Sequence, residues 1–168
     1  RPYVVIDRDS IYDAQGKIRS GTRDFVTLKK FMDPVRINPT SRVGTRDIIV
    51  MRFAEMYMII GEAEFQVGNG GDATIAINVL RTRAAIPGKE ADMQITAAEF
   101  ANYENGRDFI LAERAREFCG EYMRWFDLKR MLYRNNGQEF VSFIKAKNPD
   151  IVDVQDFHRL RPIRQEEL

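Results

Sequence analysis

The pattern that most restricts the fold of this 168-residue chain is a set of apolar residues recurring at spacings of three and four. Its members are Ile49, Phe53, Met56, Ile60, Ala63 and Val67. This period predicts one buried face of a long α-helix that begins near Ile48. The glycine-rich stretch 68–71 ends that helix, and Asp72 can cap a second helix that stops at Pro87. The sequence therefore predicts an antiparallel helical hairpin.

A second pair of helices is predicted further along the chain. Thr96 and Glu99 have the spacing of a capping box, and a longer helical pattern begins at Asp108. Gly120 is expected to bend or break that helix, and the helical pattern then continues to Tyr133. The first hairpin has roughly the length of a tetratricopeptide-type unit. We therefore expect a mainly α fold of tetratricopeptide-like helical hairpins, an α-α superhelix.

Three stretches of the chain differ in character. Residues 1–46 are interrupted by prolines, glycines and polar residues, and they predict loops and short strands, one of them at 3–6. Residues 47–134 carry the helical hairpins. Residues 135–168 are expected to form an irregular C-terminal segment.

The composition excludes several classes of function. The 26 basic and 25 acidic residues nearly cancel, and no basic stripe is present, so a nucleic-acid partner is not expected. Cys119 is the only cysteine, which excludes an intrachain disulfide and a cysteine-based zinc site, and its neighbours favour a small buried side chain. His158, the only histidine, belongs to no triad or metal motif. No metal and no cofactor are expected.

Acidic and basic residues alternate in the segment ERAREFCGEYMRWFDLKRM, residues 113–131. Glu113 and Glu117 could act as the paired carboxylates of a glycoside hydrolase. However, a catalytic acid needs a raised pKa, whereas neighbouring cations lower the pKa of a carboxyl group. Structural ion pairs between helices are therefore favoured, because guanidinium groups suit carboxylates well. The candidates are Arg52, Glu55, Glu62, Arg81, Arg83, Glu113, Arg114, Glu117, Arg124, Asp127 and Arg130.

The aromatic residues give weaker indications. Trp125 and Phe126 could form a platform for sugar stacking, but their position within a predicted helix favours packing between helices. Tyr12, Tyr103 and Tyr133 lie near predicted loops or helix ends, so they are the candidates for contact with a ligand.

Four blocks of the sequence carry a resemblance to one family. They are DIIVMRFAEMYMIIGEA at 47–63, NVLRTRA at 78–84, ERAREF with Glu121 and RWFDLKR at 113–130, and LRPIRQ with Glu167 at 160–167. In this order they resemble the C-terminal part of SusD/RagB-type nutrient-binding outer-membrane lipoproteins of Bacteroidetes. Arg164 departs from the family pattern, which has proline at this place. Residues 1–46 fit the family only loosely.

The resemblance implies that residues 1–168 are the C-terminal part of a SusD/RagB-like domain built on tetratricopeptide-like helix pairs. It also implies a non-enzymatic protein on the surface of the outer membrane, anchored by a lipid on an upstream N-terminus. Such a protein binds an oligosaccharide or another nutrient and delivers it to a SusC-like, TonB-dependent transporter. The family forms its ligand site from variable loops, so no binding residue can be transferred. The alternative is a helical-repeat scaffold that binds only proteins.

Overall fold

The computed structural model describes residues 8–15, 17–19, 28–31, 33, 35, 38, 43–132, 138–148 and 150–160. Helices dominate this part of the chain. The α-helices are α1 (Arg8–Ile11), α2 (Phe53–Gln66), α3 (Gly70–Ala84), α4 (Glu90–Met93), α5 (Tyr103–Glu117), α6 (Arg124–Met131) and α7 (Gln138–Lys147). The 3-10 helices are η1 (Lys29–Phe31), η2 (Ala97–Phe100) and η4 (Asp156–Arg159). An isolated antiparallel bridge joins Tyr12 to Ile18.

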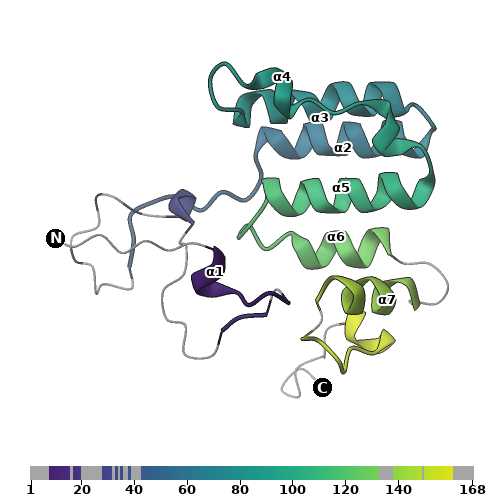
Figure 1. The fold of residues 1–168 in the computed structure, drawn as a ribbon. Coiled ribbons are helices and arrows are strands. Elements are labelled where there is room, and N and C mark those ends of the chain that lie inside the picture. The colour runs from purple at the N-terminus through teal and green to yellow at the C-terminus, as the bar shows by residue number, and fades with distance from the viewer. Residues whose placement is uncertain are drawn as a thin grey trace, which may run out of the picture.

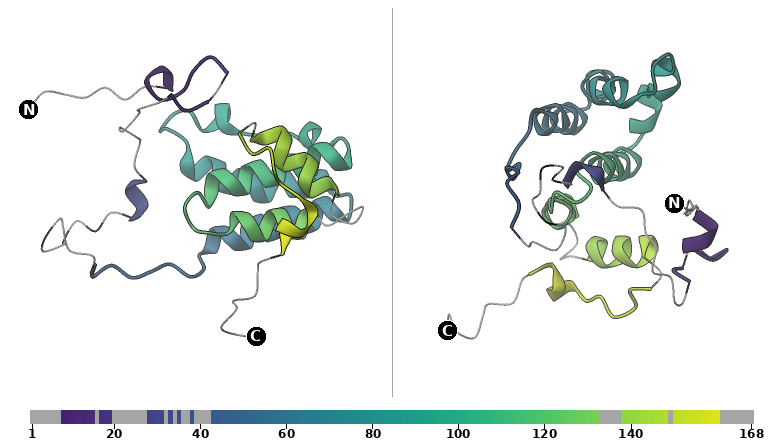
Figure 2. Two further views of the ribbon diagram at one scale, coloured as in Figure 1. Left: turned by 90° about the horizontal axis from the view of Figure 1, so that it is seen from below. Right: turned by 90° about the vertical axis from the view of Figure 1, so that its left-hand side faces the viewer.

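Helices α2, α3, α5 and α6 lie alongside one another (Figure 1), and the right-hand view of Figure 2 shows them nearly end-on. Helix α7 is seen from the side in that view, so it runs across the direction of the other helices. The mainly α architecture of helical hairpins that the sequence predicts is therefore confirmed. None of the helices in the described part of the chain is long and apolar enough to cross a membrane.

Two glycines allow the helices to approach closely. A Cβ atom on Gly61 of α2 would lie 2.9 Å from Cγ1 of Ile77 on α3. A Cβ atom on Gly106 of α5 would lie 2.2 Å from the ring of Phe65 on α2. The absence of a side chain at these positions lets α3 and α5 each pack closely against α2, which lies between them in Figure 1.

The predicted buried face of α2 is wrong. The buried residues of this helix are Ala54, Met58, Gly61 and Phe65, whereas Phe53 is 73% exposed and Val67 71% exposed. Apolar residues occur on all sides of α2, so spacings of three and four fit more than one face of this helix. The face that packs against the neighbouring helices is the one that carries the small residues Ala54 and Gly61. The start is also later than predicted, because residues 48–51 are exposed and α2 begins at Phe53. Asn69, not Asp72, is the residue that precedes α3.

The apolar core lies between the helices. Its largest fully buried apolar side chains come from α2, α3, α5 and α7 and from the end of α6, and they are Met58, Ile77, Ile110, Leu111, Leu132 and Phe140. Half-buried Trp125 packs against this core, with its ring centroid 5.3 Å from that of Phe140 in an edge-to-face arrangement. Of the two interpretations of Trp125, a platform for sugar stacking or packing between helices, the structure shows packing between helices.

Helix α7 and Cys119 differ from the expectation, whereas the end of α5 and the capping box at Thr96 agree with it. Helix α7 lies inside the segment expected to be irregular, and it is held by buried Phe140 and Ile144, one turn apart. Helix α5 ends at Glu117, ahead of Gly120 with a φ of 79°, as the glycine predicted. Cys119 is therefore exposed in the turn after α5, and the expectation of a buried thiol is wrong. The capping box at Thr96 is present, although it opens the short helix η2.

Candidate functional site

Arginine–carboxylate pairs connect the helices along their inner flanks. Arg81 on α3 binds Glu113 on α5 through two hydrogen bonds, from Nε to Oε1 at 3.0 Å and from Nη2 to Oε2 at 2.8 Å. Arg116 donates to the same carboxylate from one turn further along α5. The remaining nitrogen of Arg81, Nη1, donates to the carbonyl oxygen of Met93 at 3.0 Å. Arg81 therefore connects α3 both to α5 and to the C-terminal end of α4.

Arg52, the residue before α2, is bound to the C-terminal end of α5. Its Nη1 donates to Oε1 of Glu117 at 2.5 Å, and its Nη2 donates to the carbonyl oxygen of the same residue at 2.6 Å. Its Nε donates to both carboxylate oxygens of Glu121, at 3.0 and 3.1 Å. Arg83 also donates to Glu117, at 2.7 Å, and Lys30 lies 2.8 Å from Glu121. Cations are favourable here because the carbonyl groups at a helix C-terminus carry partial negative charge.

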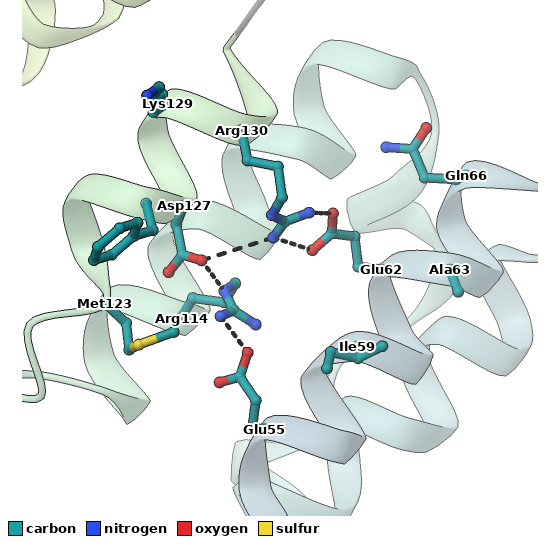
Figure 3. Close-up of a pocket in the computed structure, with 11 residues that line it drawn as sticks. Glu55, Ile59, Glu62, Ala63, Gln66, Arg114, Met123, Asp127, Lys129 and Arg130 are labelled. Atoms are coloured by element: carbon teal, nitrogen blue, oxygen red, sulfur yellow. Dashed lines mark hydrogen bonds and ion pairs between the residues drawn. The ribbon is translucent and has the colours of Figure 1, made fainter. Parts of the chain in front are cut away.

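Arg114 connects three helices from a buried position. Its side chain is 1% exposed, and its Nη2 lies 2.6 Å from Oε1 of Glu55 on α2. Its Nε lies 2.8 Å from Oδ1 of Asp127 on α6 (Figure 3). The guanidinium group also lies against the ring of Phe118, 5.0 Å from its centroid. Arg52 lies over the same ring at 4.9 Å.

Arg130 and Arg124 both lie on α6, but the first binds carboxylates and the second binds a backbone carbonyl oxygen. Arg130 donates to Glu62 on α2 with two nitrogens, Nη2 at 2.8 Å from Oε2, and lies 3.7 Å from Asp127 (Figure 3). Arg124 donates instead to the carbonyl oxygen of Leu111 at 2.6 Å and forms no ion pair within the described ranges. Of the eleven residues for which sequence analysis predicts ion pairs, the structure thus brings all but Arg124 into pairs.

The arginines control the ionisation of the acidic residues. Burial raises the pKa of Glu113, but hydrogen bonds and charge from Arg81 and Arg116 outweigh it and leave the pKa below its ordinary value. The pKa of Glu117 is lowered in the same way, because Arg83 and Arg52 outweigh the effect of burial. The carboxylates of Glu113 and Glu117 are therefore ionised at neutral pH, and their oxygens accept hydrogen bonds from guanidinium groups. A carboxylate in this state does not suit general acid catalysis.

A cavity of about 830 Å³ lies between α2 and α6, with Arg114 of α5 also lining it (Figure 3). Its lining residues are Glu55, Ile59, Glu62, Ala63, Gln66, Arg114, Met123, Phe126, Asp127, Lys129 and Arg130. Three of these side chains are acidic and three are basic, so the formal charge of the lining is zero. The size falls within the range of small-molecule sites, which is about 300–1,000 Å³.

A second cavity, of about 770 Å³, lies among α6, α7 and the segment 150–160. It is lined by Trp125, Phe140, Ile144, Asp150, Ile151, Val152, Asp153, Val154, His158 and Leu160. Most of these side chains are apolar. His158 accepts a hydrogen bond from the backbone N–H of Gln155 at its Nδ1, at 2.9 Å, so it has a structural contact in its own turn.

Of the three tyrosines proposed from sequence as ligand contacts, Tyr12 is not among the residues that line either cavity. Tyr12 is 38% exposed and pairs with Ile18 in the N-terminal bridge. Tyr103 is the first residue of α5. Tyr133 lies outside the described residues. Within those residues no group of acidic, histidine or cysteine side chains could hold a metal ion.

Sequence reasoning missed Tyr122, in the turn between α5 and α6. This residue has a φ of 63°, the only positive φ among the described residues other than glycine, and it is 90% exposed. The left-handed conformation costs roughly 1–2 kcal/mol for a residue with a Cβ atom. Nothing in the local sequence except the neighbouring Gly120 indicates this backbone conformation.

Comparison with known proteins agrees with the four sequence blocks. The model of the SusD family matches residues 10–168. "SusD-like protein P2" of Formosa agariphila is 30% identical over 95 residues, and "SusD-like protein P38" of the same organism is 28% identical over 95 residues. Each match covers 56% of this chain but 19% of the relative. No solved structure matches the chain. Because the family model spans nearly all of its residues, the chain belongs to the SusD family.

Proposed function

We propose that the chain is part of a non-enzymatic cell-surface protein that binds a nutrient, a glycan in the first place, and delivers it to a TonB-dependent transporter. The observation that carries this proposal is the match of the SusD family over residues 10–168. The protein would lie on the outer face of the outer membrane and be anchored there by a lipid on an upstream segment. The transporter, of the SusC type, would be its partner.

The chemistry of the carboxylates supports binding over catalysis. A glycoside hydrolase requires one carboxyl group with a raised pKa and a second one free to attack or to activate water. Glu113 and Glu117 meet neither requirement, because each is hydrogen-bonded to arginine and each has a lowered pKa. The two cavities, in contrast, offer apolar and polar side chains together, which is the usual composition of a small-molecule site.

Calorimetry on the full-length protein with a panel of oligosaccharides and peptides tests the proposal. We expect saturable binding to at least one oligosaccharide without release of reducing sugar. Release of reducing sugar that disappears in a Glu117→Gln variant would contradict the non-enzymatic function. Absence of binding to every member of the panel, with a transporter still co-purifying from outer membranes, would indicate a scaffold that binds only proteins.

A further inference from the structure

The turn between α2 and α3 contains an Asn–Gly pair, Asn69–Gly70 (Figure 1). Asparagine is a thermolabile residue, because the nitrogen of the following peptide group can attack its side-chain amide carbon. A following glycine has no Cβ atom to hinder this approach, and it leaves the backbone free to rotate. The sequence contains two further Asn–Gly pairs, at 105–106 and at 136–137, and the second of these lies outside the described residues. The surroundings of each pair determine whether it reacts.

The attacking nitrogen of the first pair is not engaged. The N–H of Gly70 belongs to the first turn of α3, where N–H groups have no acceptor within the helix, and it donates no hydrogen bond to the described residues. Asn69 is exposed, and its ψ of 62° is far from the value of about −42° in an α-helix. Rotation of this torsion carries the Gly70 nitrogen toward the Asn69 side chain, and no hydrogen bond of Gly70 opposes the rotation.

The side-chain amide of Asn69 lies beside a carboxylate. Its Nδ2 donates to Oε2 of Glu64 at 2.9 Å, and the backbone N–H of Asn69 donates to the carbonyl oxygen of Glu64 at 2.8 Å. Both residues of the side-chain contact are at the surface, so water, the second reactant, reaches the amide. Asn69 is thus held in place while its amide stays open to solvent.

The pair at 105–106 has the opposite surroundings. It lies in the first turn of α5, where the N–H of Gly106 donates to the carbonyl oxygen of Asn102 at 3.0 Å. The N–H of Asn105 donates to Oδ1 of Asn102 at 2.8 Å. Gly106 is also buried against the ring of Phe65. Attack by the Gly106 nitrogen therefore requires this turn of α5 to open first.

We infer that Asn69 is a site of spontaneous deamidation in the folded protein and that Asn105 is protected from it. The Gly70 nitrogen forms a bond to Cγ of Asn69 and gives its proton to solvent, and the Cγ–Nδ2 bond breaks as Nδ2 takes up a proton and leaves as ammonia. Water then opens the cyclic imide at one of its two carbonyl groups, which gives aspartate or isoaspartate. The formal net charge of the chain falls from +1 to zero.

The products change the start of α3. Neither aspartate nor isoaspartate can donate to Glu64, so two carboxylates replace a hydrogen bond. Isoaspartate also lengthens the backbone by a methylene group just before Gly70, where a Cβ atom would lie 3.2 Å from Cβ of Phe100 on η2. The carbonyl oxygen of Asn69, which accepts from the N–H of Ala73 at 3.0 Å, is displaced by this insertion. Isoaspartate therefore loosens the first turn of α3.

Peptide mapping by mass spectrometry tests the inference on the full-length protein, incubated in native buffer and, in parallel, in urea. Conversion of the amide to a carboxyl group changes the peptide mass, and chromatography separates the aspartate and isoaspartate forms. In native buffer we expect Asn69 to react at least about tenfold faster than Asn105, because Asn105 must wait for local opening of α5. In urea the two rates should agree within about threefold, since neither site is then protected by structure.

Two variants serve as matched controls. Asn69→Gln keeps an amide at this position, but the attack then has to close a larger ring, so the peptide should keep its mass. Gly71→Ala changes the glycine after the pair, where nothing lies within 4 Å of a Cβ atom, and it should leave the rate at Asn69 unchanged. In the isoaspartate fraction of the wild type, amide hydrogen exchange in the first turn of α3 should be faster than in the unmodified fraction.

Equal rates at Asn69 and Asn105 in native buffer would overturn the inference. A reaction of Asn69 that occurs in urea but not in native buffer would overturn it as well, because the folded turn would then be protective. Unchanged amide exchange in the isoaspartate fraction would overturn the loosening of α3. These outcomes are independent of the proposed nutrient-binding function.

Discussion

Arg81 on α3 and Glu113 on α5 meet through two parallel hydrogen bonds, at 3.0 and 2.8 Å, although 32 residues separate them in the sequence. Their side chains are 17% and 9% exposed, so the pair is largely removed from water. This geometry gives the charged pattern of the sequence a testable role in joining the first helical hairpin to the next helix.

Removing one partner of this pair is expected to destabilise the fold strongly. Arg81→Ala or Glu113→Ala leaves a largely buried charge without its partner, and the expected loss is about 3–5 kcal/mol of unfolding free energy. Arg116→Ala is the control, because Arg116 contacts the same carboxylate but its side chain is 57% exposed. It should cost below about 1 kcal/mol. Urea unfolding measures the free energy of unfolding of the three variants. Losses that are small and equal in all three would contradict a structural role for the Arg81–Glu113 pair.

Arg114 is expected to be intolerant even of lysine. Its planar guanidinium group reaches Glu55 and Asp127 at the same time, at 2.6 and 2.8 Å, which a single ammonium group cannot reproduce. Arg114→Lys should therefore lose about 2 kcal/mol or more of unfolding free energy, the scale of a broken hydrogen bond to a charged group. A double-mutant cycle with Glu55→Gln should show coupling of about 1–3 kcal/mol between the two residues. Strict additivity would contradict the connection through Arg114.

Stability is expected to fall in acid because of the paired glutamates. The pKa values of Glu113, Glu117 and Glu121 are held below their ordinary value of 4.5 by arginine and lysine partners, although burial acts in the opposite direction. The unfolded chain therefore binds more protons than the folded chain near this pH. The stabilisation is fully present above pH 4.5 and is lost as the pH falls through the lower pKa values of the folded state.

Urea titrations at a series of pH values between 3 and 7 measure this dependence. Glu117→Gln should reduce the slope of unfolding free energy against pH in the acid range, because one of the shifted groups is removed. A slope that is unchanged by this substitution would show that Glu117 is not among the groups that couple folding to pH.

A Gly106→Ala substitution is expected to destabilise the fold, although Gly106 lies inside helix α5. Alanine is favoured over glycine in a helix by about 1 kcal/mol, but a Cβ atom here would lie 2.2 Å from the Phe65 ring. We expect Gly106→Ala to lower the melting temperature, since Phe65 must leave its packed position. Gly71→Ala is the matched control, because nothing lies within 4 Å of a Cβ atom at that position of α3. An increase in melting temperature for both variants would contradict close packing of α5 on α2.

The helical hairpins themselves follow from the sequence alone. Local signals are sufficient for this, since the glycines after Val67, the capping box at Thr96 and the positive φ of Gly120 each act within a few residues. The alternation of acidic and basic residues in 113–131 likewise indicates pairing between helices. The four blocks indicate the family, and the family model confirms it.

Which face of α2 is buried was decided only by tertiary structure. Phe53 and Val67 are more apolar than Ala54 and Gly61, yet the smaller pair is buried, because close approach of α3 and α5 requires small side chains. Burial here depends on fit between helices distant in sequence, and hydropathy does not encode that fit.

The backbone conformation of Tyr122 is likewise not evident from the local sequence. The sequence places an aromatic residue after Gly120 and Glu121, which by itself predicts nothing unusual. Its φ is nevertheless 63°, and the residue before it, Glu121, is bound by Arg52, which lies 69 residues away in the sequence. Local propensities determined where the helices form, whereas long-range ion pairs and steric fit determined how they pack and which side chains remain exposed.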